Sequence, residues 1–378
     1  MAIAAKDFEF MARAIQLAKK GQYTTHPNPR VGCVLTKNNE IIGEGYHKRA
    51  GEPHAEINAI SNCKTSLKGA TAYVTLEPCS HTGKTPPCAN ALIDAKVSRV
   101  IIAMQDPNPQ VAGEGIQRLK NAGIDVEVSV LEEQSRQLNL GFIKRMEKGL
   151  PWVRVKLAMS LDGRTAMASG ESKWITGAEA RQDVQRLRAS ADAILTGVGT
   201  VLADDPSLNV RLSASELGID GAVFQPKRIV VDTHLKTPLN SKLFKIDGEN
   251  LIITSKKTVS ENEKLVKSFN ALGAKVLKVA NDKNHTDRLC VKTILQELAK
   301  QEINEVHVEA GATLCGSLIQ QKLVDEIILY MAPVFMGSEA RGLLHLPELK
   351  QMSDKIELSI DDIHSVGKDW RLSIRPQY

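Results

Sequence analysis

Four residues in the first half of the chain combine metal-binding side chains with a spacing that suits hydrolysis. They are His54, Glu56, Cys79 and Cys88. A catalytic zinc ion takes three protein ligands and keeps a fourth position open for water. We expect His54, Cys79 and Cys88 to be those ligands, with zinc lowering the pKa of the water towards neutrality. Glu56 would then move the proton without ligating the metal.

The spacing of the two cysteines departs from the motif of zinc nucleobase deaminases. That motif is H-x-E followed by P-C-x-x-C, whereas SHTGKTPP places eight residues between Cys79 and Cys88. This loop contains His81 and Lys84, and Lys84 could bind a substrate phosphate beside the metal. Three alternatives stay open: the loop is merely solvated, the cysteines are buried thiols, or His81 replaces one ligand.

Two glycine-rich segments in the second half follow predicted strands. TGVGTVLADDP spans residues 196–206 and EAGATLCGS spans 309–317, and neither is a G-x-G-x-x-G or Walker A motif. The second segment lies between a strand and a helix, where free backbone N–H groups and the helix dipole favour phosphate binding. A plain strand-to-helix turn is the alternative.

These motifs need a scaffold, and the hydrophobic pattern predicts an α/β layer structure in each half. In the first half the predicted order is an amphipathic N-terminal helix, a hairpin of strands 31–36 and 40–46, helix 54–61, strand 71–76, helix 88–95, strand 99–104, helix 114–123 and strand 124–130. Helix N-termini near Cys79 and Cys88 would favour their thiolates. Gly149 and Pro151 mark a boundary near residue 150.

The second half alternates strands with helices, which predicts a mostly parallel sheet. Its predicted strands are 152–160, 193–197, 228–232, 250–254, 275–279, 305–310 and 325–333, and its predicted helices are 177–190, 289–301 and one that ends at Gln320. Residues 211–225 have no regular pattern and are expected to form a surface excursion.

Composition limits the classes of partner. The 378 residues include 49 Lys and Arg against 44 Asp and Glu, a net charge of +5, and 4% are aromatic. This balance suits an anionic small molecule and not a nucleic acid, which needs a basic and aromatic surface. No apolar run approaches the roughly 18 residues of a membrane span. Six cysteines without a recognisable signal peptide favour thiols or metal ligands, so we expect a cytoplasmic protein.

Longer motifs resemble one enzyme family from about residue 8 to the C-terminus. The motifs HPNPRVGCV (26–34), GEPHAEINAI (51–60), TLEPCSHTGKTPPC (75–88), KLAMSLDGRTA (156–166), SGESKWITG (169–177), GVGTVLADDPSLNVR (197–211) and VEAGATLCGSL (308–318) are similar to the bacterial riboflavin-biosynthesis bifunctional deaminase-reductase. The resemblance implies an α/β fold with two domains. Residues 1–149 would be a cytidine-deaminase-like, three-layer, zinc-dependent pyrimidine deaminase, and residues 150–378 a dihydrofolate-reductase-like, NADPH-dependent reductase.

The resemblance also implies two consecutive reactions on one small phosphorylated pyrimidine. The first is the hydrolytic deamination of 2,5-diamino-6-(5-phosphoribosylamino)pyrimidin-4-one. The second reduces the ribosyl side chain to give 5-amino-6-(5-phosphoribitylamino)uracil. The implied cofactors are Zn²⁺ and NADPH, and the choice of NADPH over NADH rests on the resemblance alone. Enzymes of this kind are often symmetric, so we expect a homo-oligomer, a dimer or tetramer.

Individual roles follow from the same resemblance. In the first half it carries zinc ligation to His54, Cys79 and Cys88, proton transfer to Glu56, and substrate binding to Asn28, His47, His81 and Lys84. In the second half it implies substrate contacts at Ser172, Arg188, Leu208, Arg211 and Glu309, and cofactor contacts at Ala158, Trp174, Thr200, Asp204, Gly311, Ala312, Thr313, Leu314, Cys315, Gly316 and Ser317. The alternatives are an exposed turn for His47, surface charge for Arg188 and a core position for Trp174.

The reduction also needs a proton donor near the opened ribose. Lys156, flanked by apolar residues on a predicted strand, and Asp204 are our hypothetical catalytic residues. A structural salt bridge is the alternative role for Lys156. Two other functions stay open for the whole chain: a nucleoside or tRNA deaminase with an unrelated C-terminal nucleotide-binding module, and a nucleotide-sensing protein that has lost catalysis.

Overall fold

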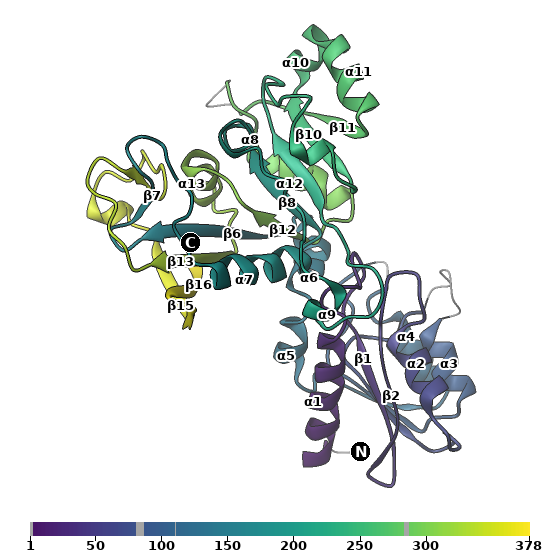
Figure 1. Cartoon of the computed structure of the whole chain (residues 1–378). Coiled ribbons are helices and arrows are strands. Elements are labelled where there is room, and N and C mark those ends of the chain that lie inside the picture. The colour runs from purple at the N-terminus through teal and green to yellow at the C-terminus, as the bar shows by residue number, and fades with distance from the viewer. Residues whose placement is uncertain (1–2, 81–86, 110, 283–286) are drawn as a thin grey trace. The chain divides into compact units, whose positions relative to one another are not determined.

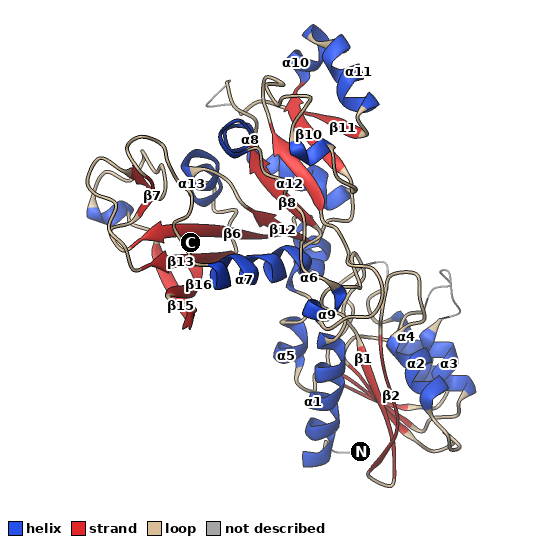
Figure 2. Ribbon diagram, in the orientation of Figure 1, coloured by secondary structure: helices blue, strands red, loops and turns tan. Residues whose placement is uncertain are grey.

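The computed structural model describes residues 3–80, 87–109, 111–282 and 287–378 of the chain. These residues form two compact units, Met1–Gly149 and Leu150–Tyr378. Each unit has its own central sheet with helices on both faces (Figures 1 and 2).

The first unit has a five-stranded sheet with the strand order β2-β1-β3-β4-β5. Its elements are α1 (Ala5–Lys19), β1 (Gly32–Lys37), β2 (Glu40–Tyr46), α2 (Ala55–Asn62), β3 (Thr71–Val74), α3 (Cys88–Asp94), β4 (Arg99–Ile102), α4 (Glu114–Asn121), β5 (Asp125–Val128), α5 (Glu132–Arg136) and α6 (Leu140–Lys148). Strands β2, β1 and β3 pair antiparallel, and β3, β4 and β5 pair parallel. The hairpin turn expected after residue 36 is confirmed, because Asn38 and Asn39 take the left-handed conformation that such turns need.

Alternating side chains divide this sheet into two buried faces. Leu35, Val74 and Ile102 point to the side covered by α2, α3 and α4. Val34 and Ile101 point to the other side, where α1 packs. The result is three layers, and the ligand-bearing segments all lie on or next to the three-helix side.

Close contact between β2 and α2 fixes the helix that follows His54. A side chain on Gly45 would place its Cβ 2.3 Å from the backbone nitrogen of Ala59 and 2.5 Å from the carbonyl oxygen of Ala55. Only glycine therefore lets the helix lie this close to the sheet, and the position of the first turn of α2 depends on it.

The second unit has a nine-stranded sheet with the order β11-β10-β9-β8-β12-β6-β13-β16-β15 and a small β14-β7 pair. Its first elements are β6 (Trp152–Ser160), β7 (Arg164–Ala166), α7 (Ala178–Ala189), β8 (Ala193–Gly197), α8 (Val198–Asp204), α9 (Ala214–Leu217), β9 (Lys227–Val231), a 3₁₀ turn (Lys242–Phe244), β10 (Asn250–Ser255), α10 (Lys256–Glu261) and α11 (Glu263–Ala271). They are followed by β11 (Ala274–Val279), α12 (Val291–Lys300), β12 (Glu305–Val308), α13 (Ala312–Gln320), β13 (Glu326–Ala332), β14 (Arg341–Gly342), a 3₁₀ turn (Met352–Asp354), β15 (Glu357–Val366) and β16 (Asp369–Gln377).

The prediction of a mostly parallel sheet is confirmed, since within these nine strands only the pairs β13–β16 and β16–β15 are antiparallel. One face is apolar and packs on α12 and α13, with Val155, Val306 and Leu329 at its centre. The opposite face is covered by α7 over Ile328 and Tyr330, and by α8 and α11 over Val230 and Ile252.

Three predictions about local structure need correction. Residues 198–204 of the first glycine-rich segment form helix α8, which was not among the predicted helices. The strand list also omitted the C-terminal hairpin β15–β16, whose alternation is broken by a bulge between Ile360 and Asp362. The irregular excursion over 211–225 holds one short helix, α9, which Ser213 caps by accepting a hydrogen bond from the Glu216 amide.

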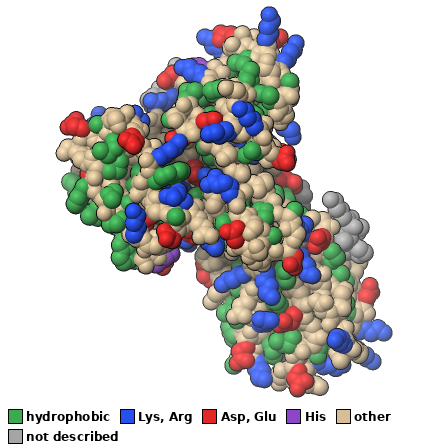
Figure 3. All heavy atoms as spheres, in the orientation of Figure 1, with side chains coloured by type: hydrophobic (Ala, Val, Ile, Leu, Met, Phe, Trp, Pro, Cys, Tyr) green, Lys and Arg blue, Asp and Glu red, His purple; other side chains and the backbone are tan. Residues whose placement is uncertain are grey.

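The visible surface carries acidic and basic side chains intermixed (Figure 3). Among the residues that the structure describes, no helix has both the length and the apolar composition required to span a lipid bilayer.

Candidate active sites

In the first unit, three potential metal ligands meet where β3 ends and two helices begin. His54 caps α2, Cys79 follows β3, and Cys88 is the first residue of α3. His54 Nδ1 lies 3.6 Å from Cys79 Sγ and 3.2 Å from Cys88 Sγ, and all three ligand atoms lie within 4.8 Å of one another. Bonds of about 2.3 Å to sulfur and 2.0 Å to nitrogen give ligand separations of about 3.5 to 3.8 Å around tetrahedral zinc. The donor set and its spacing therefore fit that ion.

The electrostatics of the trio favour a cation between the ligands. A hydrogen bond from the Cys88 thiol, helped by the His54 side chain, lowers the pKa of Cys79 to about 4, while burial opposes the shift. The backbone N–H of Cys88 also donates to Cys79 Sγ at 3.3 Å. Because Cys79 is already a thiolate at neutral pH, its interaction with Cys88 raises the pKa of the second thiol. A divalent cation in place of the proton that the two thiols share would stabilise both of them as thiolates.

Glu56 lies in the first turn of α2 and is 3% exposed. Burial raises its pKa to about 7, and the negative charge of Cys79 adds to the shift. A carboxyl group with a pKa near the working pH can both accept and release a proton. Glu56 is thus suited to proton transfer beside the three ligands.

Asn28 and His47 form a hydrogen-bonded pair near His54. The His47 ring is 3% exposed and lies 5.3 Å from the His54 ring, so the alternative of an exposed turn is wrong. Because the Pro53 carbonyl can only accept, His47 Nδ1 donates to it at 3.2 Å. His47 Nε2 then accepts from Asn28 Nδ2 at 3.1 Å, and burial lowers the pKa of the ring. The two other residues predicted to bind substrate here, His81 and Lys84, lie outside the described residues.

In the second unit, a buried ion pair joins α7 to the end of β12. Arg188 donates from Nε and Nη2 to the two carboxylate oxygens of Glu309 at 2.6 and 2.9 Å, and from Nη1 to the Asn209 carbonyl at 2.9 Å. Arg188 is 7% exposed, so the alternative of surface charge is wrong. Burial raises the pKa of Glu309, but the charge and hydrogen bonds of Arg188 outweigh it and hold that pKa well below its usual value.

Lys156 lies on the same face of the sheet, on β6. Its Nζ is 5.9 Å from the centre of the Tyr330 ring, and burial lowers the pKa of its ammonium group. No salt bridge within hydrogen-bonding distance joins Lys156 to an acid among the described residues. Arg211 lies close enough to Arg188 for the two charges to repel, and burial together with that repulsion lowers the pKa of Arg211.

Apart from the turn over 309–317, the other residues predicted to bind substrate or cofactor in the second half are Ala158, Ser172, Trp174, Thr200, Asp204 and Leu208. Ala158 is on β6, Thr200 and Asp204 are on α8, and Asp204 pairs with Lys173 at 3.3 Å. Trp174 is 70% exposed under the Arg181 guanidinium, so the core alternative is wrong for it. Ser172 lies in the segment that leads to α7, and Leu208 is a buried residue with positive φ.

The turn over 309–317 leads, as predicted, from a strand into a helix, with Gly311 as the N-cap of α13. Ala312, Thr313 and Leu314 form its first turn. Cys315 and Gly316 face inwards: Cys315 belongs to the core, and a side chain on Gly316 would collide with the His345 carbonyl oxygen. Ser317 follows one turn into the helix.

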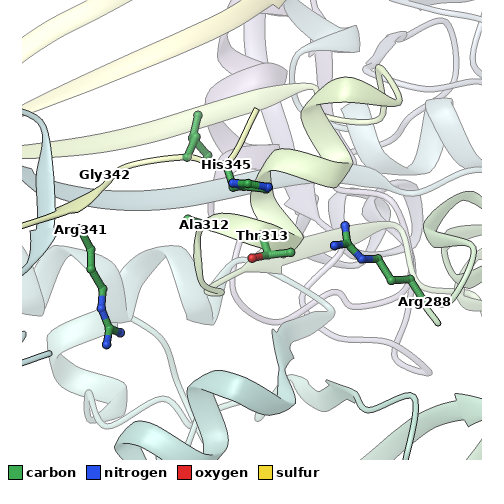
Figure 4. Close-up of a pocket in the computed structure, with 7 residues that line it drawn as sticks. Arg288, Ala312, Thr313, Arg341, Gly342 and His345 are labelled. Atoms are coloured by element: carbon green, nitrogen blue, oxygen red, sulfur yellow. The ribbon is translucent and has the colours of Figure 1, made fainter. Parts of the chain in front are cut away.

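A pocket of about 360 Å³ opens beside this first turn (Figure 4). Its lining brings three basic side chains, Arg288, Arg341 and His345, to Ala312 and Thr313. In Figure 4 the Arg288 side chain extends towards Thr313, and Arg341 lies across the pocket. These three residues could not be predicted from the sequence, because each is an isolated basic residue in a loop or short strand, with no motif around it.

Both halves of the chain match known protein families. Residues 4–104 match the cytidine and deoxycytidylate deaminase zinc-binding region, and residues 151–372 match the RibD C-terminal domain. Riboflavin biosynthesis protein RibD of Escherichia coli is 49% identical over 369 residues, covering 96% of this chain and 98% of that protein. The protein of that name from Haemophilus influenzae is 47% identical, covering 98% of each chain.

Solved structures give the same result. Acinetobacter baumannii RibD superposes with a TM-score of 0.89 at 44% identity over 99% of both chains. A diaminohydroxyphosphoribosylaminopyrimidine deaminase/5-amino-6-(5-phosphoribosylamino)uracil reductase from Thermotoga maritima superposes with a TM-score of 0.84 at 32% identity over 98% of this chain and 99% of that one. The expected pairing of a cytidine-deaminase-like with a dihydrofolate-reductase-like fold is confirmed, and the alternative of an unrelated C-terminal module is wrong.

The ligand cluster generates a prediction about metal content. We expect Cys79→Ser to lose most bound zinc, because a serine hydroxyl is a poor substitute for the thiolate, while Cys63→Ser keeps it. Cys63 is a suitable control because it is a half-buried free cysteine at the C-terminal cap of α2. Zinc per chain is measured by mass spectrometry of metals after dialysis. Equal zinc contents in the two variants would contradict the assignment of Cys79.

Proposed function

The chain belongs to the RibD family of bifunctional riboflavin-biosynthesis deaminase-reductases, and from this premise we propose which part and which residues carry each reaction. Met1–Gly149 deaminates 2,5-diamino-6-(5-phosphoribosylamino)pyrimidin-4-one. Leu150–Tyr378 then reduces the ribosyl side chain with NADPH and releases 5-amino-6-(5-phosphoribitylamino)uracil. The observation that carries the proposal is the trio of His54, Cys79 and Cys88 beside a buried Glu56, in a chain whose other half is a reductase domain.

For the deamination, His54, Cys79 and Cys88 hold the zinc ion. When bound, zinc lowers the pKa of a water molecule so that it can act as a nucleophile near pH 7. Glu56 accepts the water proton and passes it to the departing amine, which its pKa of about 7 allows in both directions.

Asn28 completes the pyrimidine side of this site. Its side-chain amide can bind an edge of the ring, and His47 fixes the direction of that amide through the hydrogen bond between them. As the sequence resemblance implies, His81 and Lys84 are proposed to bind the substrate as well, Lys84 through its charge to the phosphate.

For the reduction, we propose that Glu309, Arg188, Arg211, Ser172 and Leu208 form the substrate site. Arg211 offers a guanidinium to the substrate phosphate, and the repulsion from Arg188 makes an added anion favourable there. NADPH, when bound, supplies the hydride. Lys156 is the proposed proton donor, with Asp204 as the second hypothesis. Asp204 pairs with Lys173, whereas no acid among the residues that the structure describes forms a salt bridge with Lys156.

The cofactor site is proposed to run along Ala158, Trp174, Thr200 and Asp204 to the first turn of α13, from Gly311 to Ser317. Free amides at that helix N-terminus suit the diphosphate. The pocket beside it adds the basic side chains of Arg288, Arg341 and His345. Because NADPH carries one phosphate more than NADH, the charges of the two arginines support NADPH as the preferred cofactor.

We further propose that the chain works as a homo-oligomer in the cytoplasm. Leu358, Ile360 and Ile363 of edge strand β15 are 51%, 58% and 54% exposed. They pair with residues of β16 that include the core residue Ile374. They therefore extend the apolar face of the sheet beyond the part that α12 and α13 cover. Hydrophobic side chains are visible around these strands in Figure 3. A second copy bound at this edge would bury them, and the six free cysteines suit a reducing compartment.

The product formed from the diaminopyrimidinone substrate tests the whole proposal. Zinc-loaded protein with NADPH is expected to exchange one amine for oxygen and add two hydrogens, as measured by mass spectrometry. In Glu56→Gln the first reaction should fall by at least about 100-fold, because the general acid and base is lost. The variant should still bind zinc and reduce the deaminated intermediate. An unchanged substrate with the native protein, or full deamination by the variant, would contradict the proposal.

The pH dependence of the reductase tests Lys156. Burial lowers its pKa, so the ammonium form that can donate a proton is lost, as the pH rises, earlier than for an ordinary lysine. We expect reductase kcat to fall through that lowered pKa, and Lys156→Met to lower kcat by about 100-fold and remove this alkaline limb. Deamination by the variant should be unchanged. Lys300→Met, at an exposed lysine on α12, is the control. An alkaline limb that persists in Lys156→Met sinks the assignment.

Cofactor binding tests the pocket beside α13. We expect Arg288→Gln combined with Arg341→Gln to weaken NADPH binding about 10- to 100-fold, the effect of one or two lost charged hydrogen bonds. NADH binding should change by less than about threefold. Dissociation constants are measured from nicotinamide fluorescence, with Arg375→Gln, an arginine paired with Asp361 on the C-terminal hairpin, as the control. Equal losses for both cofactors would show that the pocket does not select NADPH.

A further inference from the structure

Helix α4 contributes no metal ligand, yet its first turn contacts the segment that carries Cys79. The Glu77 side chain is 4% exposed and accepts three hydrogen bonds from backbone amides. Its Oε2 accepts from Asp106 N at 3.1 Å and Gly113 N at 3.0 Å, and its Oε1 accepts from Ile116 N at 3.1 Å. Gly113 is the N-cap of α4 and has no side chain to satisfy these amides. Glu77 therefore caps α4 from a distant part of the chain.

The residues on both sides of Cys79 contact the same helix turn. A side chain on Gly115 would place its Cβ 2.0 Å from the Pro78 carbonyl oxygen, so the helix backbone lies directly against Pro78. On the other side, Ser80 Oγ donates to Glu114 Oε2 at 3.1 Å. Three neighbours of the ligand in the chain, Glu77, Pro78 and Ser80, are thus held by α4.

The second cysteine ligand is connected to the same helix. Arg118 on α4 donates from Nη1 to Asn90 Oδ1 on α3 at 3.1 Å. Helix α3 begins at Cys88, and its amides from Cys88 and Ala89 donate to Cys79 Sγ and to the Cys79 carbonyl. Helix α4 therefore holds Cys79 through the residues before and after it. It holds Cys88 through α3, the helix that begins at this cysteine.

We propose that Glu77 is a positioning residue that sets the affinity of the cysteine pair for zinc. The inference rests on the proposed zinc site and adds the residue that holds its geometry. A carboxylate is needed because three N–H groups converge on two oxygens, and a carboxylate offers acceptors alone. Glutamine has the same shape, but its NH₂ group would face at least one of these backbone N–H donors and could not accept a hydrogen bond from it. The loop would shift, and with it Cys79. Residues that orient metal ligands typically change metal affinity 10- to 100-fold when replaced.

Zinc affinity of the full-length Glu77→Gln variant tests this role. The dissociation constant is measured by competition with a chromophoric chelator, and we expect it to rise about 10- to 100-fold over the native protein. The cobalt-loaded variant should show an altered visible spectrum, because that spectrum reports the arrangement of the thiolates. Reduction of the deaminated intermediate, which belongs to the other unit, should persist and show that the chain folds.

Asp7→Asn is the matched control. Asp7 is also a 4%-exposed carboxylate in the first unit, and it accepts from the Ala4 amide, the Tyr73 hydroxyl and the Arg99 guanidinium. It lies on α1, across the sheet from α2, α3 and α4. We expect this variant to lower the melting temperature of the apo protein without changing the zinc dissociation constant by more than about twofold.

Two outcomes would overturn the inference. In one, Glu77→Gln lowers the melting temperature but binds zinc within about twofold of the native protein, which makes Glu77 merely structural. In the other, Asp7→Asn weakens zinc binding as much as Glu77→Gln.

If Glu77→Gln does not fold, a second variant keeps the test possible. Ser80→Ala removes one contact to α4 and should still weaken zinc binding severalfold; unchanged zinc binding in this variant would also overturn the inference. A native protein that binds no zinc would instead refute the proposed function itself.

Discussion

Unsatisfied amides at the starts of three helices are the constraint on which the first unit depends. Helices α2, α3 and α4 all begin close to the metal ligands, and each leaves N–H groups that need acceptors. Cys79 Sγ accepts from the first residue of α3, and Glu77 accepts from the first turn of α4. The partial positive charge of these helix ends lowers the cost of gathering thiolate and carboxylate in a buried place. Cys79, which accepts from α3, thus belongs to the proposed metal site, and Glu77, which accepts from α4, holds the segment that carries Cys79.

The second unit keeps charge inside the protein by a different arrangement. There, basic and acidic side chains lie between α7 and the sheet and neutralise one another: Arg154 pairs with Glu326 and Arg188 with Glu309. A buried ion pair is a poor source of stability because desolvation offsets its attraction. The burial of the pair of Arg188 and Glu309, at the end of β12 that leads to α13, instead supports the substrate site proposed for this unit. Among the described residues no acid pairs with Lys156 in this way, which supports the proton transfer proposed for it.

Periodicity and motif spacing predicted most of the scaffold, and the failures have identifiable causes. Strands 152–160 and 193–197 were predicted with their observed bounds, because apolar and charged residues alternate in the first and a short apolar run ends at Gly197 in the second. Strand β15 was missed because the bulge after Ile360 shifts the alternation by one residue. The trio of ligands could be predicted because the metal fixes both residue type and order. Glu77, Arg288 and Arg341 could not, since their roles depend on which distant backbone or cavity the fold brings to them.

The two faces of the second sheet also bear on how its strands find their partners. Val153 and Val155 on β6 and Val306 and Val308 on β12 point into the apolar core, while Arg154 and His307, paired across the same two strands, point to the charged side under α7. A slip of one residue would exchange these faces and push a guanidinium or an imidazole into a dry core. The side-chain pattern of each central strand therefore strongly disfavours a register shifted by one residue.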